Sequence, residues 1–221
     1  ALSATPQVSV HSTPSGPRVL YVTATPGNAK LEYVGLPPYS STSPTLVGES
    51  GGALLGYDCA DGTDVCVYAG TSSGLMLHTS VGQQSVSLPP AAWPSVAVAP
   101  SGSMFVVWAA DEDDNSINGS ELLKGRMYNS DLSPVSEHQV ISAASNINAV
   151  RIVATATGFF TVFAANSAGT SGVYGQMLDS AGAPYGVPAL LGDPATGPQA
   201  DPRLALLADG RVLVAWRDGN G

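Results

Sequence analysis

The sequence predicts an all-β protein, and within that class a β-propeller-like array of about four-stranded blades. Three observations lead to this prediction: the composition, the lack of helical periodicity and an internal repeat. The 221 residues include 25 Gly and 17 Pro, and only 11% are charged. Such a composition is typical of short strands joined by tight turns, and it disfavours helices. No segment of the sequence has the apolar spacing of an amphipathic helix.

The internal repeat is clearest in two segments, residues 94–108 and residues 202–216. Each has two alternating apolar runs around a turn and ends in a tryptophan. The turn glycines, Gly102 and Gly210, both lie six residues before that tryptophan. This pattern is typical of a β-hairpin.

Fainter copies of the same hairpin end at Phe163, after the turn glycine Gly158, and at Tyr68, after Gly62. A first copy surrounds residues 15–16 and has residues 19–22 as its second strand. The aligned positions are spaced by 46, 40, 55 and 53 residues; they are Val22, Tyr68, Trp108, Phe163 and Trp216. This is the scale of one four-stranded propeller blade.

Two further strand-like runs follow the hairpins, for example residues 122–128 and 138–142 in the third repeat. We therefore predict a single repeat domain over residues 1–221. Its units are at about 6–48, 53–92, 93–148 and 149–201, with an incomplete fifth at 202–221. Four full units and half of a fifth leave an unpaired strand edge. We expect either a piece of a longer propeller or a fifth unit that a partner chain or another copy completes.

The fourth and fifth repeats also carry a family resemblance. Residues 172–184 followed by residues 202–216 resemble the repeats of large secreted bacterial adhesin-like proteins, which alternate an "IYGQRFDxxG" strand with a "PxVAxLxDGGFVVxW" hairpin. The resemblance covers residues 94–221 and is weak in the first 90. It implies an extracellular, adhesion-related protein, and no catalytic residue belongs to the motif.

The charge of the chain excludes some partners. Eight Lys and Arg face 17 Asp and Glu, which gives a formal net charge of −9. An acidic protein repels a phosphate backbone and an anionic lipid surface, so nucleic acid is excluded as the expected partner. The longest apolar runs have the length of strands and are too short to cross a bilayer as helices, so we expect no membrane insertion.

The two cysteines, Cys59 and Cys66, flank the turn at residues 60–65 symmetrically. Antiparallel strands that close on this turn would place them opposite each other, within bridging distance. The spacing predicts a hairpin disulfide and therefore an oxidising compartment, so the protein is expected to be secreted or at the cell surface. The alternatives are two free buried thiols or half of a metal site.

A run of acidic residues after the third hairpin is the candidate metal site. Asp111, Asp113 and Asn115 alternate as Ca²⁺ ligands do, although residue 116 is Ser where an EF-hand has Gly. The alternative is a solvated acidic loop that keeps strand edges apart. Asn118 begins a glycosylation sequon, which predicts a glycan if the source is eukaryotic. Asp58, Asp61 and Asp64 are explained as turn residues.

The aromatic residues that end the second strand of each hairpin are expected to pack one sheet on the next; they are Tyr68, Trp108, Phe163 and Trp216. The alternative is a row of sugar-binding rings. The three histidines are far apart in sequence and are expected to be structural; they are His11, His78 and His138. Two G-x-S-x-G patterns, at residues 48–52 and 70–74, are expected to be coincidences. Too little chain precedes the first for a protease triad, and no helix follows the second.

Together these features predict an extracellular, non-catalytic binding or adhesion module whose ligand is a carbohydrate or a surface protein. One alternative is a secreted propeller glycoside hydrolase or polysaccharide lyase, in which carboxylates of different blades converge. The other is a structural subunit of a surface filament, completed by strand addition from a neighbour.

Overall fold

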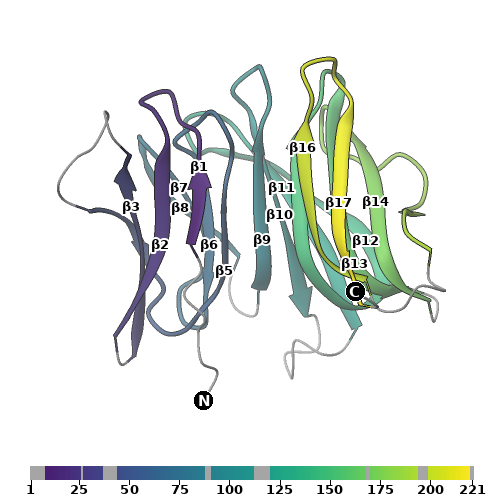
Figure 1. The fold of residues 1–221 in the computed structure, drawn as a ribbon, viewed down its shortest axis with the longest axis horizontal. Coiled ribbons are helices and arrows are strands. Elements are labelled where there is room, and N and C mark those ends of the chain that lie inside the picture. The colour runs from purple at the N-terminus through teal and green to yellow at the C-terminus, as the bar shows by residue number, and fades with distance from the viewer. Residues whose placement is uncertain are drawn as a thin grey trace.

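The computed structural model describes residues 8–25, 27–36, 44–87, 91–111, 120–167, 170–193 and 199–219. All regular structure in these ranges is β: they form 17 strands, paired antiparallel, and contain no helix (Figure 1). None of the described residues therefore forms an apolar helix of membrane-spanning length. The predicted all-β class is confirmed.

The first two sheets are four-stranded meanders in which each strand pairs with the next along the chain. We call them the first and second units. The strands of the first unit are β1 (Val8–His11), β2 (Arg18–Thr25), β3 (Asn28–Gly35) and β4 (Thr45–Glu49). Those of the second unit are β5 (Leu54–Cys59), β6 (Cys66–Gly70), β7 (Gly74–Thr79) and β8 (Gly82–Ser87).

The next sheet has seven strands in the order β15-β14-β13-β12-β11-β10-β9. Its strands are β9 (Ala91–Val98), β10 (Met104–Asp111), β11 (Ser120–Tyr128), β12 (Pro134–Ala154), β13 (Gly158–Ser167), β14 (Thr170–Asp179) and β15 (Ala189–Leu190). We call β9 to the first half of β12 the third unit, and the second half of β12 to β15 the fourth unit.

The 21-residue strand β12 joins these two units. Its first half pairs with β11 and its second half with β13. The sequence predicted a unit boundary at 148/149, but one strand runs across that position, since residues 143–150 contain no Gly or Pro to end it. Asn146 and Ala149 have positive φ angles of 54° and 50° and coincide with shifts in register, so the strand bends there instead of ending.

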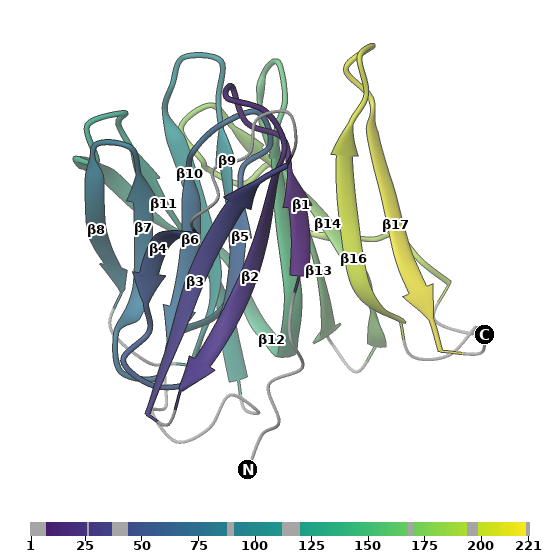
Figure 2. The ribbon, with the colours of Figure 1, turned by 60° about the vertical axis from the view of Figure 1, so that its left-hand side comes forward.

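The fifth unit is a two-stranded sheet of β16 (Gln199–Leu206) and β17 (Val212–Asp218). Strand β16 contacts β12, β13 and β14, so this hairpin packs against the fourth unit (Figure 2). Within the described residues, β17 pairs with β16 alone.

A backbone irregularity recurs at the start of the later hairpins. Trp93, Ala149 and Asp201 occupy the same position in the third, fourth and fifth units and have φ angles of 53°, 50° and 53°. Each lies at a shift in the register between the first two strands of its unit. A left-handed conformation is unusual for residues other than Gly. The repeat therefore extends to the backbone even where the side chains differ.

Three apolar clusters fill the interfaces between consecutive units, one for each of the first three interfaces. Tyr68 belongs to the cluster between units one and two, Trp108 to that between two and three, and Phe163 to that between three and four. All three side chains are at most 2% exposed. Trp216 of the fifth unit is only partly buried. Apolar area removed from water stabilises each interface by about 25 cal/mol per Å².

The first of these interfaces also explains the G-x-S-x-G pattern at residues 48–52. Tyr68 lies directly against Gly48, where an added Cβ would clash with the ring carbon Cζ and the hydroxyl, so only Gly fits. The buried Ser50 hydroxyl donates to the carbonyl oxygen of Gly52 at 2.6 Å, and the carbonyl oxygen of Ala29 lies 3.2 Å away. This glycine and serine serve packing between the first two units.

Candidate functional site

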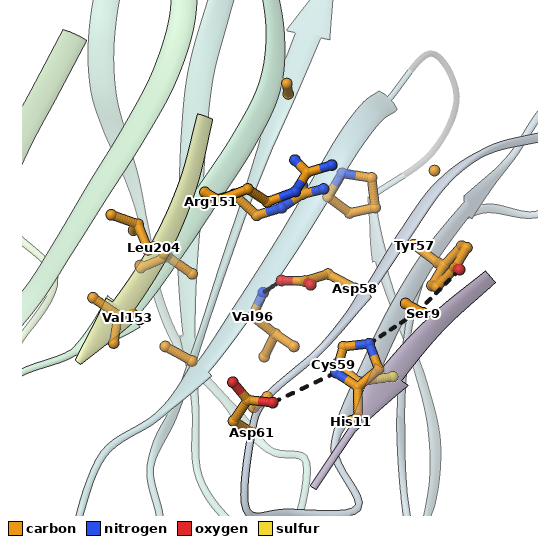
Figure 3. A pocket seen from close by; sticks show the side chains of 18 of the residues that line it. Ser9, His11, Tyr57, Asp58, Cys59, Asp61, Val96, Arg151, Val153 and Leu204 are labelled. Carbon is orange, nitrogen blue, oxygen red and sulfur yellow. Dashed lines mark hydrogen bonds and ion pairs between the residues drawn. The ribbon is translucent and has the colours of Figure 1, made fainter. Parts of the chain in front are cut away.

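A cavity of about 920 Å³ lies along the first strands of the five units, β1, β5, β9, β12 and β16 (Figure 3). All five strands contribute lining residues, although they come from positions as far apart in sequence as Val8 and Leu206. The cavity therefore follows from stacking the repeats side by side. We call it the central pocket.

Four polar residues occupy the same register position in consecutive units. Each lies on the first strand of its unit and pairs with a residue of the second strand. That residue directly precedes the aromatic residue at the end of the hairpin pattern, which is Tyr68, Trp108, Phe163 or Trp216. The pairs are Asp58↔Val67, Ser95↔Val107, Arg151↔Val162 and Arg203↔Ala215. We call Asp58, Ser95, Arg151 and Arg203 the polar row. All but Ser95 line the central pocket.

Asp58 ties the first strands of three units together. Its carboxyl accepts hydrogen bonds from the Ser95 hydroxyl and, at 3.3 Å, from the backbone N–H of Val96. The Ser95 oxygen in turn accepts the backbone N–H of Ile152 at 3.1 Å. Burial raises the pKa of Asp58, while the nearby Arg151 and the hydrogen bond from Ser95 oppose that shift.

The interpretation of Asp58 as a turn residue was wrong. The residue lies within β5, and its carboxyl is hydrogen-bonded across to β9 instead of to the turn. Asp64 does lie beside the turn, where its carboxylate forms an ion pair with Arg18 of the first unit.

Arg151 and Arg203 bring two positive charges into the pocket. The Nη1 atom of each donates to the carbonyl oxygen one residue earlier, Val150 at 2.7 Å and Pro202 at 3.1 Å. Burial lowers the pKa of Arg203, and the neighbouring charge of Arg151 adds to that effect. Among the described residues, neither guanidinium forms an ion pair with a carboxylate.

A hydrogen-bonded group from the first two units forms another part of the lining. The Ser9 hydroxyl lies 2.9 Å from His11 Nε2 and 3.1 Å from the Tyr57 hydroxyl. His11 Nδ1 is 3.7 Å from an Asp61 carboxylate oxygen, and Figure 3 shows the four side chains together. Burial raises the pKa of Tyr57. The sequence predicted a structural His11, but the structure places it on the pocket wall.

Ser9, His11 and Asp61 stand in the order of a nucleophile, a base and an orienting acid. The 3.7 Å separation is longer than a hydrogen bond, and the Asp61 side chain is 84% exposed. The carboxylate therefore makes no hydrogen bond to the imidazole, and it does not fix the ring as a catalytic triad requires. The geometry suits polar recognition better than nucleophilic attack.

The sequence-predicted sites lie mostly outside the pocket. Cys59 and Cys66 are joined at an S–S distance of 2.05 Å, and Cys59 reaches the pocket wall. Asp113, Asn115 and Asn118 lie outside the described residues, and of Asp111 only the backbone, at the end of β10, is described. The part of the chain that the structure describes holds no group of three His, Cys, Asp or Glu placed to bind a metal.

The pocket residues, Arg151 and Arg203 above all, were not predicted from the sequence. The aromatic residues on which the hairpins align belong to the interfaces between units. The aligned repeats do contain a pattern that could have identified the pocket residues. At one position of the first strand the residue is Ser95, Arg151 or Arg203, where an apolar residue would suit a buried strand.

No family model and no curated protein matches the chain. Among solved structures, a puromycin-hydrolyzing peptidase of Mycobacterium tuberculosis has 14% identity and a TM-score of 0.49, over 95% of this chain and 34% of that one. A puromycin hydrolase mutant complexed with PGG has 15% identity and a TM-score of 0.47, over 95% and 33%. The chain spans about a third of the length of these two proteins.

Proposed function

We propose that the protein is an extracellular, non-catalytic binding module of β-propeller type that holds a carbohydrate in its central pocket. The observation that carries this proposal is the pocket itself. Its volume of about 920 Å³ is in the range of small-ligand sites, and the first strand of every unit contributes to it. In this proposal the five units are propeller blades whose first strands line a central channel.

The chemistry of the lining favours a sugar. Trp93 is 36% exposed on the pocket wall, whereas Trp108 is buried between blades. An exposed ring face offers a flat apolar surface for the C–H face of a sugar. Tyr57, His11 and Arg151 line the same pocket and offer hydrogen-bonding groups for sugar hydroxyls. An apolar wall with a few polar groups is the combination that fixes a ligand's orientation.

The acidic residues of the described lining favour binding over hydrolysis. Glycoside hydrolysis uses two carboxyl groups on either side of the scissile bond. Here the Asp58 carboxyl is buried and bonded to Ser95, and Asp201 forms an ion pair with Arg217 at 3.1 Å. Asp61, the third acid, is 84% exposed beside the β5–β6 turn. The Cys59–Cys66 bond supports an extracellular setting, since disulfides persist in oxidising compartments.

A glycan array combined with a polysaccharide-hydrolase panel tests this proposal. We expect binding of at least one oligosaccharide without turnover, and loss of that binding in Trp93→Ala. Tyr185→Ala is the matched control, since Tyr185 is 65% exposed and does not line the pocket. Turnover of any polysaccharide contradicts the non-catalytic role, and equal binding by both variants contradicts the assignment of the pocket.

The edge of the fifth unit favours a second candidate, assembly by strand addition. Strand β17 has one partner among the described residues, and Leu213 on it is 54% exposed. A strand from another copy or from a partner chain would complete this sheet with main-chain hydrogen bonds, as in a surface filament. Light scattering over a concentration series is the test: growth beyond a closed oligomer supports assembly, and a strictly monomeric protein contradicts it.

A further inference from the structure

The two arginines of the polar row carry positive charges that the binding of a neutral sugar does not require. Each guanidinium donates a hydrogen bond to the carbonyl oxygen one residue before it, which leaves most of its five N–H donors for other partners. They lie on neighbouring strands, β12 and β16, at equivalent positions. The geometry therefore places two guanidinium groups beside each other on one wall of the pocket.

Asp58 attracts both arginines and Asp201 attracts Arg203, but among the described residues neither carboxylate forms an ion pair with them. Asp201 is paired with Arg217, and Asp58 is hydrogen-bonded to Ser95 and Val96. Like charges that approach each other out of water are costly unless a counter-charge joins them. An anionic ligand at this wall would supply that counter-charge.

We propose that the sugar bound in the central pocket carries a carboxylate, which Arg151 and Arg203 bind while Trp93 contacts the sugar ring. The planar fork of a guanidinium matches the two oxygens of a carboxylate in a bidentate hydrogen bond. This inference rests on the proposed function and names its ligand class. Sugars with a single acidic residue, such as a uronic or a sialic acid, fit it best.

The overall charge of the chain limits the length of the ligand. A net charge of −9 repels a long polyanion. At physiological salt, however, exposed charges more than about 8 Å apart are largely screened, so within the pocket the nearest charges dominate. The site is therefore suited to a short oligosaccharide with one carboxylate and not to an extended acidic polysaccharide.

Titration calorimetry with matched sugars tests the inference. The probes are sialyllactose and cellobiouronic acid, each compared with the same sugar after its carboxyl has been reduced to an alcohol, and a sulfated lactose. We expect the reduced form of the bound sugar to bind at least about tenfold more weakly, because it loses the charge-assisted hydrogen bonds to the guanidinium groups. Arg151→Gln and Arg203→Gln should each lose a similar factor.

Arg211→Gln is the control variant, because Arg211 pairs with Asp209 on the exposed β16–β17 turn and does not line the pocket. Arg203→Lys keeps the charge but removes the fork, and it should recover only part of the loss. Thermal unfolding verifies that each variant is folded. If Arg151→Gln is unstable, the affinity measured for Arg203→Gln decides the test.

The outcomes separate this inference from the proposed function. Equal binding of an acidic sugar and its reduced form would overturn the carboxylate assignment and leave carbohydrate binding intact. Stronger binding of the sulfated sugar alone would also overturn it. Binding of none of these probes, together with a blank glycan array, would overturn the proposed function itself. A loss in Arg211→Gln equal to that in Arg203→Gln would show a general charge effect and contradict the site.

Discussion

The interfaces between units and the central pocket are built from the same hairpins but use neighbouring positions differently. At the interface position the residue is aromatic in four units, and in three of them it is fully buried: Tyr68, Trp108 and Phe163. The polar row lies on the first strand, opposite the residue that comes just before this aromatic residue, and consists of Asp58, Ser95, Arg151 and Arg203. Packing therefore maintains the repeat, while the pocket gains its chemistry from the position that varies.

Replacing an interface aromatic should give the largest loss of stability. Trp108 is 1% exposed in the cluster between units two and three. Trp108→Ala removes a large buried side chain and should lower the free energy of unfolding by about 3 to 5 kcal/mol in denaturant titration. Trp108→Phe should cost much less, because it retains the ring and removes an indole N–H that is buried without a hydrogen-bond partner.

The matched control for Trp108 is Trp216→Ala in the fifth unit, where the side chain is only partly buried. Its cost should be less than half as large. Unchanged stability in Trp108→Ala would mean that the interface aromatics do not hold the units together.

The disulfide belongs to the cluster between units one and two, and Cys59 also lines the pocket. Its removal should therefore affect both regions. Cys59 and Cys66 are buried in the cluster between units one and two, and their bond closes a short loop. The loop-entropy model gives a stabilisation of about 2 to 3 kcal/mol for such a loop. Adding a reductant, or replacing both cysteines with Ala, should lower the unfolding free energy by this amount. The same midpoint with and without reductant would contradict a stabilising bond.

Substitutions of Asp58 test how much the polar row of the pocket contributes to stability. Asp58→Ala leaves the Ser95 hydroxyl and the Val96 N–H without their acceptor and should cost about 1 to 3 kcal/mol. Asp58→Asn keeps an acceptor oxygen and carries no charge, so it should be far milder. Denaturant titration of the two variants provides the measurement. A loss in Asp58→Asn as large as that in Asp58→Ala would show that the negative charge is needed.

The raised pKa of Asp58 also predicts a pH dependence. The folded state holds the proton more tightly than the unfolded chain, whose carboxyl has a pKa of about 3.9. This contribution is fully present below the unfolded pKa and is lost as the pH rises through the folded pKa. The wild type should therefore lose stability relative to Asp58→Asn across that window. A constant difference between the two would exclude the titration of Asp58.

His78 should give the smallest effect, with the opposite sign. Burial lowers its pKa in the folded state, and its Nδ1 atom is 3.3 Å from Gln83 Nε2. The stability it contributes is present above the unfolded pKa of about 6.5 and is lost as the pH falls through the folded pKa. His78→Gln should flatten the unfolding free energy between about pH 7 and pH 5. A variant that follows the wild-type curve would assign the acid sensitivity to other groups.

The sequence predicted those parts of the fold that local patterns encode. Turn glycines such as Gly102 and Gly210 have positive φ angles of 86° and 84°, which explains why they mark the hairpins. The continuous course of β12 was missed, since no local pattern shows that one strand changes its pairing partner midway. The left-handed backbone conformation of Trp93 and Asp201 was also missed. Tertiary contacts must impose this conformation on residues that do not favour it, so no local pattern predicts it.

The candidate site was harder to predict than the fold. Ser9, Asp58, Arg151 and Arg203 are distant in sequence and meet only because the units stack. In the sequence, Arg203 and Ser95 each look like an isolated polar residue in an apolar strand. A function can be assigned to such a residue only when its neighbours in space are known. The aromatic residues drew attention because they repeat, and repetition is the signature of packing.

Hydrogen exchange with and without a sugar that binds tests the central claim most directly. If the pocket along the first strands is the binding site, the ligand should slow exchange at backbone amides of β5, β9, β12 and β16, including those of Val96 and Arg203. Amides of β3 and β8, which lie away from the pocket lining, should not change. Protection confined to β17 or to residues 112–119, with none on the first strands, would contradict the account.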